Sequence, residues 1–347
     1  MTARRALKPA AAFAAVLVAT AAQAGRLIPV PAIPGSFYMT VDAINDNAQI
    51  AGEVAFDANG IIHRDAYVGT LDGQYTTFSA GDDELGATYV GGFGNDGYIS
   101  GNAYYQTDFI QCGHGFVRAP DGTITDVTRD GALLSGSANG ITTGENFVGW
   151  RCEQVGAALR RYGYYGKGTQ YVADLTLPFN ADRTTPSGLS AADGTVVGSY
   201  YDKDRRMNLG FLLKDGAATA FDFPGPDITR GAHTAFAAIN DSGMATGNWY
   251  DVSVSRAFLY DTAQQTMQTI EVKGARGVSA LGINNSGLVA LNVDAIPYIY
   301  CIRKSNCPAS PGAIDIPGTW TAVPASALTS AVCRNRCLRP HAANAGR

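Results

Sequence analysis

Aromatic and charged residues follow a glycine closely at three places in the chain, and this combination could bind a ligand. Flat rings offer large rigid contact areas to sugar rings or peptides, while Arg and Asp side chains can orient polar groups. The predicted ligand-binding residues are Trp150, Arg151, Tyr201, Asp202, Trp249, Tyr250 and Asp251, with Asp204, Arg205 and Arg206 at the rim. The alternative is that any single ring packs inside the fold, because strand side chains alternate between two faces.

Motifs for catalysis, nucleotide binding or metal coordination are absent from the sequence. It contains no Gly-x-Ser-x-Gly, Walker, Rossmann or His-Glu-x-x-His motif. His63, His114 and His233 are isolated from one another, so we expect them to have surface or loop roles. Asn45-Asp46-Asn47 resembles part of a calcium loop but lacks the spaced carboxylates that such a loop needs. We therefore assign no catalytic residue, no cofactor and no metal site.

The chain has six cysteines, which in an exported protein are expected to form disulfides. Two pairs are close in sequence, and the third pair requires that neighbouring parts of the fold meet. The predicted disulfides are Cys301–Cys307, Cys333–Cys337 and Cys112–Cys152.

An internal repeat organises most of the chain. The segment 44–52 recurs clearly as 239–247 and again from Ile283 to Val289. Its final glycine recurs at 48- or 49-residue spacing as Gly52, Gly101, Gly149, Gly198 and Gly247. A small residue before an aromatic keeps nearly the same spacing in Ala66-Tyr67, Gly115-Phe116, Gly163-Tyr164, Gly210-Phe211, Ala257-Phe258 and Pro297-Tyr298. Two markers that drift together over six copies indicate a repeated structural unit.

Each copy predicts four antiparallel strands joined by tight turns. In the fifth copy the expected strands are Thr234–Asn240, Met244–Tyr250, Arg256–Tyr260 and Met267–Val272. Asp-Gly turns such as Asp121-Gly122 suit tight hairpins, because glycine readily adopts positive φ. Four strands in roughly 40–50 residues are typical of a propeller blade. We therefore predict an all-β protein, a β-propeller of about six four-stranded blades, with an open solenoid of the same units as the alternative.

The ends of the repeat region predict how the ring closes. Residues 30–35 resemble the outer-strand endings at 220–225 and 313–318, whereas 319–328 resemble the beginning of an inner strand. We expect the chain to start with a fourth strand and end with a first strand. The two termini would then meet, close the ring and protect its edges, and they could form a rudimentary seventh blade.

The repeat resembles the bacterial HAF repeat, named for His-Ala-Phe. The resemblance rests on the Ile-Asn-Asp-Ser-Gly turn and the Ala257-Phe258-Leu259 marker, and it spans about residues 44–318. It implies an exported protein and brings no shared catalytic residues. The sequence departs from the pattern at the histidine, since only His114-Gly115-Phe116 comes close while Leu209 and Arg256 occupy that place elsewhere.

Residues 1–24 have the three parts of a secretory signal peptide. Arg4, Arg5 and Lys8 precede an apolar stretch, and Ala22-Gln23-Ala24 forms a small-x-small cleavage site. We divide the chain into a signal peptide (1–24), a β-propeller repeat domain (25–328) and a basic, Cys-containing C-terminal tail (329–347). The mature protein is expected to be a periplasmic or extracellular monomer without a transmembrane segment.

Net charge and loop length restrict the classes of function that the protein can have. Without residues 1–24, 23 basic residues face 30 acidic ones, a net charge of −7 that disfavours nucleic acid as a partner. Long loops such as 106–113 and 153–161 are expected on one face of the propeller, where binding usually resides. The leading function is an exported binding or scaffold protein for a carbohydrate or a peptide/protein ligand. The alternative is a polysaccharide-active enzyme, a lyase or glycoside hydrolase, for which a deep pocket with paired carboxylates is expected.

Overall fold

The computed structural model describes residues 25–81, 86–104, 112–156, 158–223, 233–250 and 254–332. Within these ranges the chain forms strands β1 to β30 and two short 3₁₀ helices, Lys304–Asn306 and Ala325–Ala327. The prediction of an all-β protein is confirmed. Strong β formers and frequent Gly turns explain why the described residues form strands rather than long helices.

The strand pairing divides the sheet structure into six antiparallel units, which we call units 1 to 6 in chain order. The first strands are β3 (Ala43–Ile44), β7 (Ala87–Phe93), β13 (Gly136–Asn139), β17 (Ala181–Leu189), β21 (His233–Ile239) and β25 (Val278–Ile283). The second strands are β4 (Gln49–Ala58), β8 (Ile99–Tyr104), β14 (Asn146–Val155), β18 (Val196–Asp202), β22 (Met244–Tyr250) and β26 (Leu288–Val293). The third strands are β5 (Ile61–Thr70), β9 (His114–Arg118), β15 (Ala158–Lys167), β19 (Met207–Lys214), β23 (Ser255–Asp261) and β27 (Ile296–Cys301). The fourth strands are β6 (Tyr75–Phe78), β10 (Ile124–Asp126), β16 (Gln170–Leu175), β20 (Ala217–Phe221), β24 (Thr266–Ile270) and, for unit 6, β1 (Gly25–Pro29).

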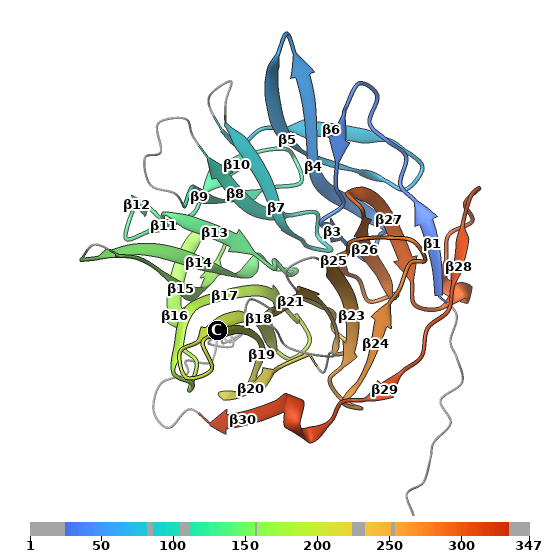
Figure 1. Ribbon diagram of the computed structural model, residues 1–347. Helices are drawn as coiled ribbons and strands as arrows, with labels where there is room; N and C mark the ends of the chain where they lie inside the picture. The colour runs from blue at the N-terminus through green and yellow to red at the C-terminus, as the bar shows by residue number, and fades with distance from the viewer. Residues whose placement is uncertain are drawn as a thin grey trace, which may run out of the picture.

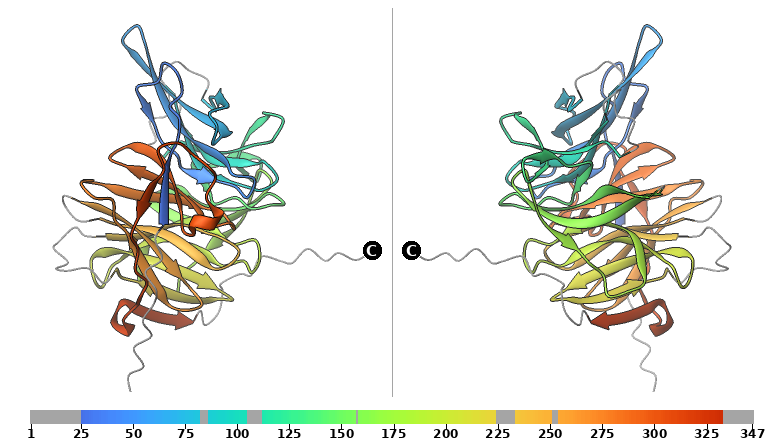
Figure 2. Two further views of the ribbon diagram at one scale, coloured as in Figure 1. Left: turned by 90° about the vertical axis from the view of Figure 1, so that its right-hand side faces the viewer. Right: turned by 90° about the vertical axis from the view of Figure 1, so that its left-hand side faces the viewer.

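The units are arranged around a common axis, as in a β-propeller (Figure 1). Residues of the first strands, or directly after them, line the axis in all six units. The short strand β2 (Tyr38–Met39) extends the inner edge of unit 1 by pairing with β4. We call the end of the ring that carries the hairpins between second and third strands the loop face, and the opposite end the turn face. The β4–β5 hairpin projects furthest from the ring (Figures 1 and 2).

The two sequence markers pack against each other in units 1 to 5, whereas unit 6 has Leu291 in place of the glycine. The aromatic ring of the third strand lies over the glycine of the second strand, so a Cβ on Gly149 would lie 2.8 Å from the Tyr164 ring. The same Cβ would lie 2.1 Å from the carbonyl oxygen of Ser137 on the first strand. The marker rings Tyr67, Phe116, Tyr164, Phe211 and Phe258 are all fully buried. Glycine is therefore required at this place because the close approach of strand and ring leaves no room for a side chain.

Strand β1 closes the ring by completing unit 6. It pairs antiparallel with β27, with Leu27 opposite Tyr300. The Asn292 side chain of β26 then links unit 6 to unit 1, because its amide bonds both the N–H and the carbonyl of Val41 at 3.1 Å. The prediction that the chain starts with a fourth strand is confirmed.

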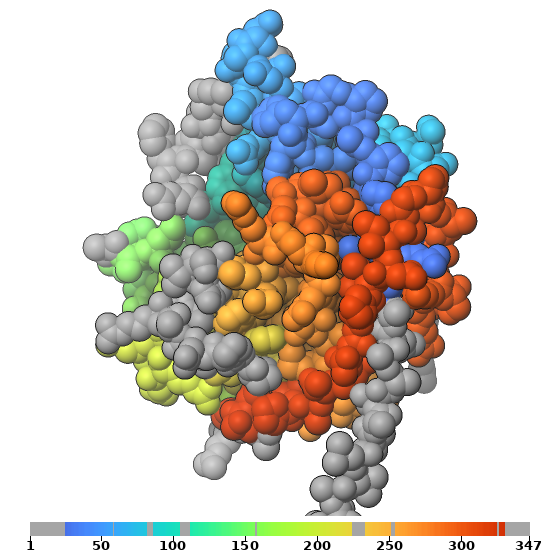
Figure 3. Space-filling model, turned by 45° about the vertical axis from the view of Figure 1, so that its right-hand side comes forward, coloured from blue at the N-terminus to red at the C-terminus, as the bar shows by residue number. Residues whose placement is uncertain are grey.

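The prediction that the chain ends with a first strand is wrong. Strands β28 (Ile314–Ile316), β29 (Thr321–Ala322) and β30 (Leu328–Val332) pair with the outer edges β1, β24 and β20. The C-terminal segment therefore runs around the outside of units 6, 5 and 4, as the red segment in Figure 3 shows. Within the described residues it adds no rudimentary seventh unit. The exposed hydrogen-bonding groups of the outer edges explain this route, since pairing covers edges that would otherwise remain open.

Candidate functional site

The axis of the ring is narrow and divided by apolar side chains. One side chain from each unit contributes to this constriction: Ile44, Phe93, Ile141, Leu189, Ile239 and Ile283. Two cavities that share these residues have volumes of about 70 and 60 Å³. Each has room for only a few water molecules. The axis therefore does not supply a deep pocket for a polysaccharide.

The polar mouth of the axis on the turn face is an inter-unit hydrogen-bond network. Asp46 accepts hydrogen bonds from the side-chain amides of Asn95 and Asn285 at 2.6 and 2.7 Å. Asn285 also donates to Asp241 at 3.0 Å. The Asp46 carboxylate of the calcium-like segment is therefore engaged in hydrogen bonds that join turns of different units.

The two tryptophans of the sequence-predicted site are buried. Trp150 is 8% exposed and lies under the Arg161 guanidinium, whose carbon is 4.3 Å from the ring centroid. Trp249 is 5% exposed and stacks on Phe223 at 5.5 Å. Trp150 directly follows Gly149, whereas Trp249 lies two residues after Gly247, so the two indoles lie on opposite faces of equivalent strands, and each is covered there by other side chains. The structure does not present them as ligand-facing rings.

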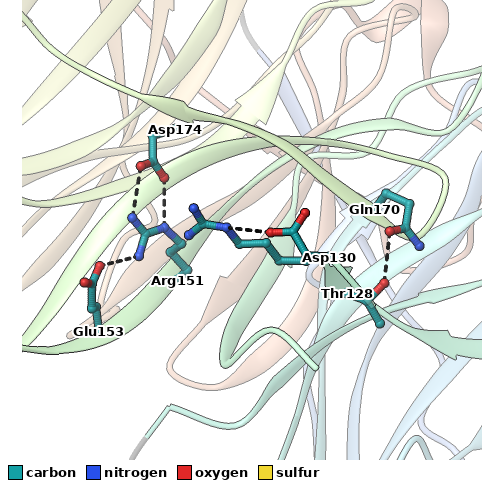
Figure 4. Close-up of polar contacts among 7 residues, drawn as sticks. Thr128, Asp130, Arg151, Glu153, Gln170 and Asp174 are labelled. Carbon is teal, nitrogen blue, oxygen red and sulfur yellow. Dashed lines mark hydrogen bonds and ion pairs between the residues drawn. The ribbon is translucent and has the colours of Figure 1, made fainter. Parts of the chain in front are cut away.

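Arg151 is held by two carboxylates of its own unit (Figure 4). Its guanidinium donates to Asp174 at 2.8 and 2.9 Å and to Glu153 at 2.7 Å. These bonds raise the pKa of the Arg151 guanidinium above its ordinary value, with the Asp174 bond as the largest cause. Arg151 thus joins β14 to β16 and, at 7% exposure, is buried instead of facing a ligand.

The remaining predicted residues make local contacts of their own. Tyr201 lies under Arg183, 4.7 Å from the guanidinium carbon, and Asp202 accepts the backbone N–H groups of Asp204 and Arg205 in a turn. Tyr250 stacks on His233 at 4.4 Å. Asp251 lies outside the described residues.

A different set of groups meets on the loop-face side of units 1 and 2. The residue after the marker glycine or its equivalent is Asn in three units, and its amide crosses to the first strand of the next unit. Asn102 donates to the Gly136 carbonyl, Asn248 to the Ala280 carbonyl and Asn292 to the Val41 carbonyl. Unit 1 has Glu53 at this place.

Glu53 lies beside a second carboxyl, that of Asp42, which lines the axial cavity. The Asp42 carboxylate accepts the Thr40 hydroxyl at 3.0 Å. Burial raises the pKa of Asp42 to about 7, and burial together with the neighbouring Asp42 charge raises the pKa of Glu53 to about 8. Arg64 acts in the opposite direction on Glu53.

Three tyrosines continue from this pair towards unit 3. Tyr38 is 36% exposed, and its pKa is raised by burial and by the charges of Glu53 and Asp42. Tyr89 packs edge to face against Tyr104, with ring centroids 5.7 Å apart. Arg161, exposed on β15, lies near enough to Tyr104 to lower its pKa against the larger raising effect of burial. We call Tyr38, Tyr89, Tyr104 and Arg161 the tyrosine arc.

Sequence reasoning missed the carboxyl pair and the tyrosine arc. The three tyrosines belong to no sequence motif. Tyr38, Tyr89 and Tyr104 lie on three different strands, β2, β7 and β8, of two units. A signal was nevertheless present, because aligning the repeats shows an acid, Glu53, where Asn102, Asn248 and Asn292 stand in other copies.

Two disulfides are present in the described residues. Cys112 is joined to Cys152, which links unit 2 to unit 3 on the loop-face side, and Cys301 is joined to Cys307. The predicted partners Cys333 and Cys337 lie outside the described residues. Across the described ranges, no group of three or more His, Cys, Asp or Glu residues could hold a metal ion. The same ranges contain no helix that is long and apolar enough to span a membrane.

Among known proteins, the chain shows similarity to solved structures only. No protein-family model matches the chain, and no curated protein matches it. It is similar to a protein assigned as TolB from Agrobacterium tumefaciens, with a TM-score of 0.44, 12% identity and coverage of 70% of this chain and 85% of that one. It is also similar to a streptogramin B lyase, with a TM-score of 0.36, 13% identity and coverage of 80% and 97%. For prolyl oligopeptidase B from Galerina marginata the TM-score is 0.42, the identity 10% and the coverage 76% and 44%. Because these TM-scores lie below 0.5, the description of the fold rests on the strand pairing of the protein itself.

Proposed function

We propose that this chain is an exported six-bladed β-propeller of the HAF-repeat type that binds a carbohydrate on its loop face. Units 1 to 6 serve as the blades, and the tyrosine arc across blades 1 to 3 is the binding surface. The two disulfides support an oxidising, extracytoplasmic location, because such bonds persist where thiols are not kept reduced.

The tyrosine arc is the observation that carries the proposal. Tyr38 is well exposed, and Tyr89 and Tyr104 are both partly exposed beside it. Partly exposed tyrosines combine a flat apolar face with a polar hydroxyl, which suits the faces and hydroxyl edges of sugar rings. Arg161 and the Asp42–Glu53 pair add polar groups at the two ends of the row. Trp150 then supports Arg161 from below instead of forming the surface.

Titration calorimetry with dextran, xylan, chitosan and polygalacturonate tests the proposal. Tyr89→Ala and Tyr104→Ala should each weaken binding by up to about tenfold, since a lost ring contact is worth roughly 0.5–1.5 kcal/mol beyond its buried area. Tyr98→Ala is the matched control, because this partly buried tyrosine precedes β8 on the turn face. If the parent protein binds none of these polysaccharides but binds peptides on an array, the carbohydrate proposal is wrong.

A second candidate, a polysaccharide-active enzyme, is favoured by the Asp42–Glu53 pair alone. Glycoside hydrolysis commonly uses one protonated and one ionised carboxyl, and burial and mutual repulsion push this pair towards that state near neutral pH. The same polysaccharides should then release reducing ends or unsaturated products, and Asp42→Asn should abolish the release. Glu271→Gln, an exposed carboxyl outside the pair, should leave it unchanged. Binding without product release would eliminate this candidate.

A further inference from the structure

Arg161 of the tyrosine arc has an equivalent in unit 1, which is Arg64. Each lies two residues before the small residue of the aromatic marker, and both side chains are exposed. The same place holds an uncharged residue in the other four units: Gly113, Asn208, Ser255 and Ala295. A cation therefore stands at this place only in units 1 and 3, the two neighbours of unit 2.

The strand pairing places Arg64 between two tyrosines of the arc. Tyr38 lies opposite Ala55, and Ala55 lies opposite Arg64. On the other side, Arg64 pairs with Ala87, which lies opposite Tyr104. Residues in register on paired strands point to the same face of a sheet, and neighbouring strands are about 4.8 Å apart. Tyr38, Arg64 and Tyr104 therefore follow one another along the backbone at intervals of roughly 10 Å, with only alanine methyl groups between them.

Arg161 continues this order beyond Tyr104. Its guanidinium carbon lies 4.3 Å from the centroid of the Trp150 ring, and such stacking restricts the orientation of the guanidinium plane. Its strand partner Cys152 forms the disulfide with Cys112 of unit 2, with 6.4 Å between the two Cα atoms. The disulfide therefore holds the strand of Arg161 beside the unit that carries Tyr104.

Neither arginine forms an ion pair with an acid in the described part of the chain. The basic residues that do so there are Arg26, Arg129, Arg151, Arg205, Lys214 and Lys304. An exposed guanidinium presents its N–H donors in a planar fork that matches a carboxylate. Arg64 and Arg161 are therefore able to bind carboxylates of a ligand.

We propose that the polysaccharide is a polyuronate, an acidic chain whose carboxylates bind Arg64 and Arg161 and whose sugar rings stack on the tyrosines of the arc. The inference rests on the proposed function and names the substrate class of the same surface. A uronate residue offers an apolar ring face to a tyrosine and a carboxylate to a guanidinium. A chain of such residues therefore matches a surface on which tyrosines and arginines alternate.

The overall charge of the protein makes this local arrangement decisive. Residues 25–347 contain 23 basic and 30 acidic residues, a net charge of −7, so the molecule as a whole repels a polyanion. Attraction for a polyuronate must then come from the two arginines at the surface that binds it. Their removal is expected to abolish the preference for an acidic chain.

Titration calorimetry of the parent protein with polygalacturonate and with its fully methyl-esterified form tests the proposal. The two probes share one sugar backbone, and only the first carries charged carboxylates. The parent protein should bind polygalacturonate about tenfold or more tightly than the ester, because hydrogen bonds between charged groups are lost with the ester. Added salt should reduce this preference, since exposed charges are screened. Equal affinity for the two probes, or tighter binding of the ester, overturns the inference.

Variants of the two arginines assign the preference to this surface. Arg64→Gln and Arg161→Gln should each weaken polygalacturonate binding by about tenfold, and the double variant should bind the two probes alike. Arg183→Gln is the matched control, because this exposed arginine also lies over a ring, that of Tyr201, but belongs to unit 4 outside the arc. A double variant that keeps the preference of the parent protein shows that the carboxylates bind elsewhere and refutes the inference.

The outcomes separate this inference from the proposed function. If the parent protein binds xylan or the methyl ester but does not prefer polygalacturonate, the inference fails while carbohydrate binding stands. If the parent protein binds no polysaccharide at all, both fail together. The comparison of the two probes needs only the parent protein, so it decides the inference even where a variant does not fold.

Discussion

The Asn292 clamp allows the ring-closing contact to be tested quantitatively. Its side chain is 8% exposed and satisfies both backbone groups of Val41, which is fully buried. Asn292→Ala leaves one buried N–H and one buried carbonyl without this partner. Each such group costs about 1–3 kcal/mol, so the free energy of unfolding should fall by about 2–4 kcal/mol if water reaches the gap in part.

Urea unfolding followed by tryptophan fluorescence measures this loss directly. Asn248→Ala removes the corresponding clamp between units 5 and 6 and should give a loss of similar size. Asn146→Ala serves as the control, because this asparagine is exposed at the beginning of β14. If Asn292→Ala stays within about 0.5 kcal/mol of the parent while folding normally, the clamp contributes little and the reasoning from buried backbone groups fails.

Three further predictions concern the closure, the disulfide and the buried rings. Deleting residues 25–29 removes the fourth strand of unit 6 and should lower the melting temperature or cause aggregation; an unchanged melt would contradict closure by β1. Replacing Cys112 and Cys152 by Ser should destabilise the protein by about 2–4 kcal/mol in a denaturant titration, and non-reducing peptide mapping that joins Cys112 to another cysteine would refute the pairing. Trp249→Ala should cost about 3–5 kcal/mol in the same titration because the indole is buried against Phe223, whereas a parent-like melt would return this ring to the ligand-facing role predicted from sequence.

The repeat could be predicted from sequence because its markers obey a local packing rule. A glycine such as Gly149 and an aromatic such as Tyr164 must occur together wherever the ring covers the neighbouring strand. That requirement recurs in units 1 to 5, so it leaves a periodic trace in the sequence. The role of β1 could be predicted for the same reason, since an outer strand has a recognisable ending. The route of the C-terminal segment could not, because short strands that pair with open edges need no particular side-chain pattern.

The functional surface was harder to predict because it depends on what covers each face of a strand. Trp150 and Trp249 lie one and two residues after their marker glycines and so occupy opposite faces of equivalent strands, yet both indoles are buried. Tyr38, Tyr89 and Tyr104 come from separate strands whose proximity only the packed ring creates.

Glu53 shows what the comparison of repeats can reveal even without homologous sequences. A repeat protein carries several internal copies of each position, and most copies have to satisfy the same structural demand. Asn102, Asn248 and Asn292 meet that demand with an amide, whereas Glu53, Trp150 and Ser199 occupy the same place in units 1, 3 and 4 and lower the consistency of the repeat there. Such exceptions are expected at positions where the side chain has a functional role instead of a packing role. Of the six residues at this place Glu53 is the one acid, so its charge distinguishes it, whereas Trp150 at the same place is buried; charge within a repeat position is therefore a better guide to the candidate site here than ring size.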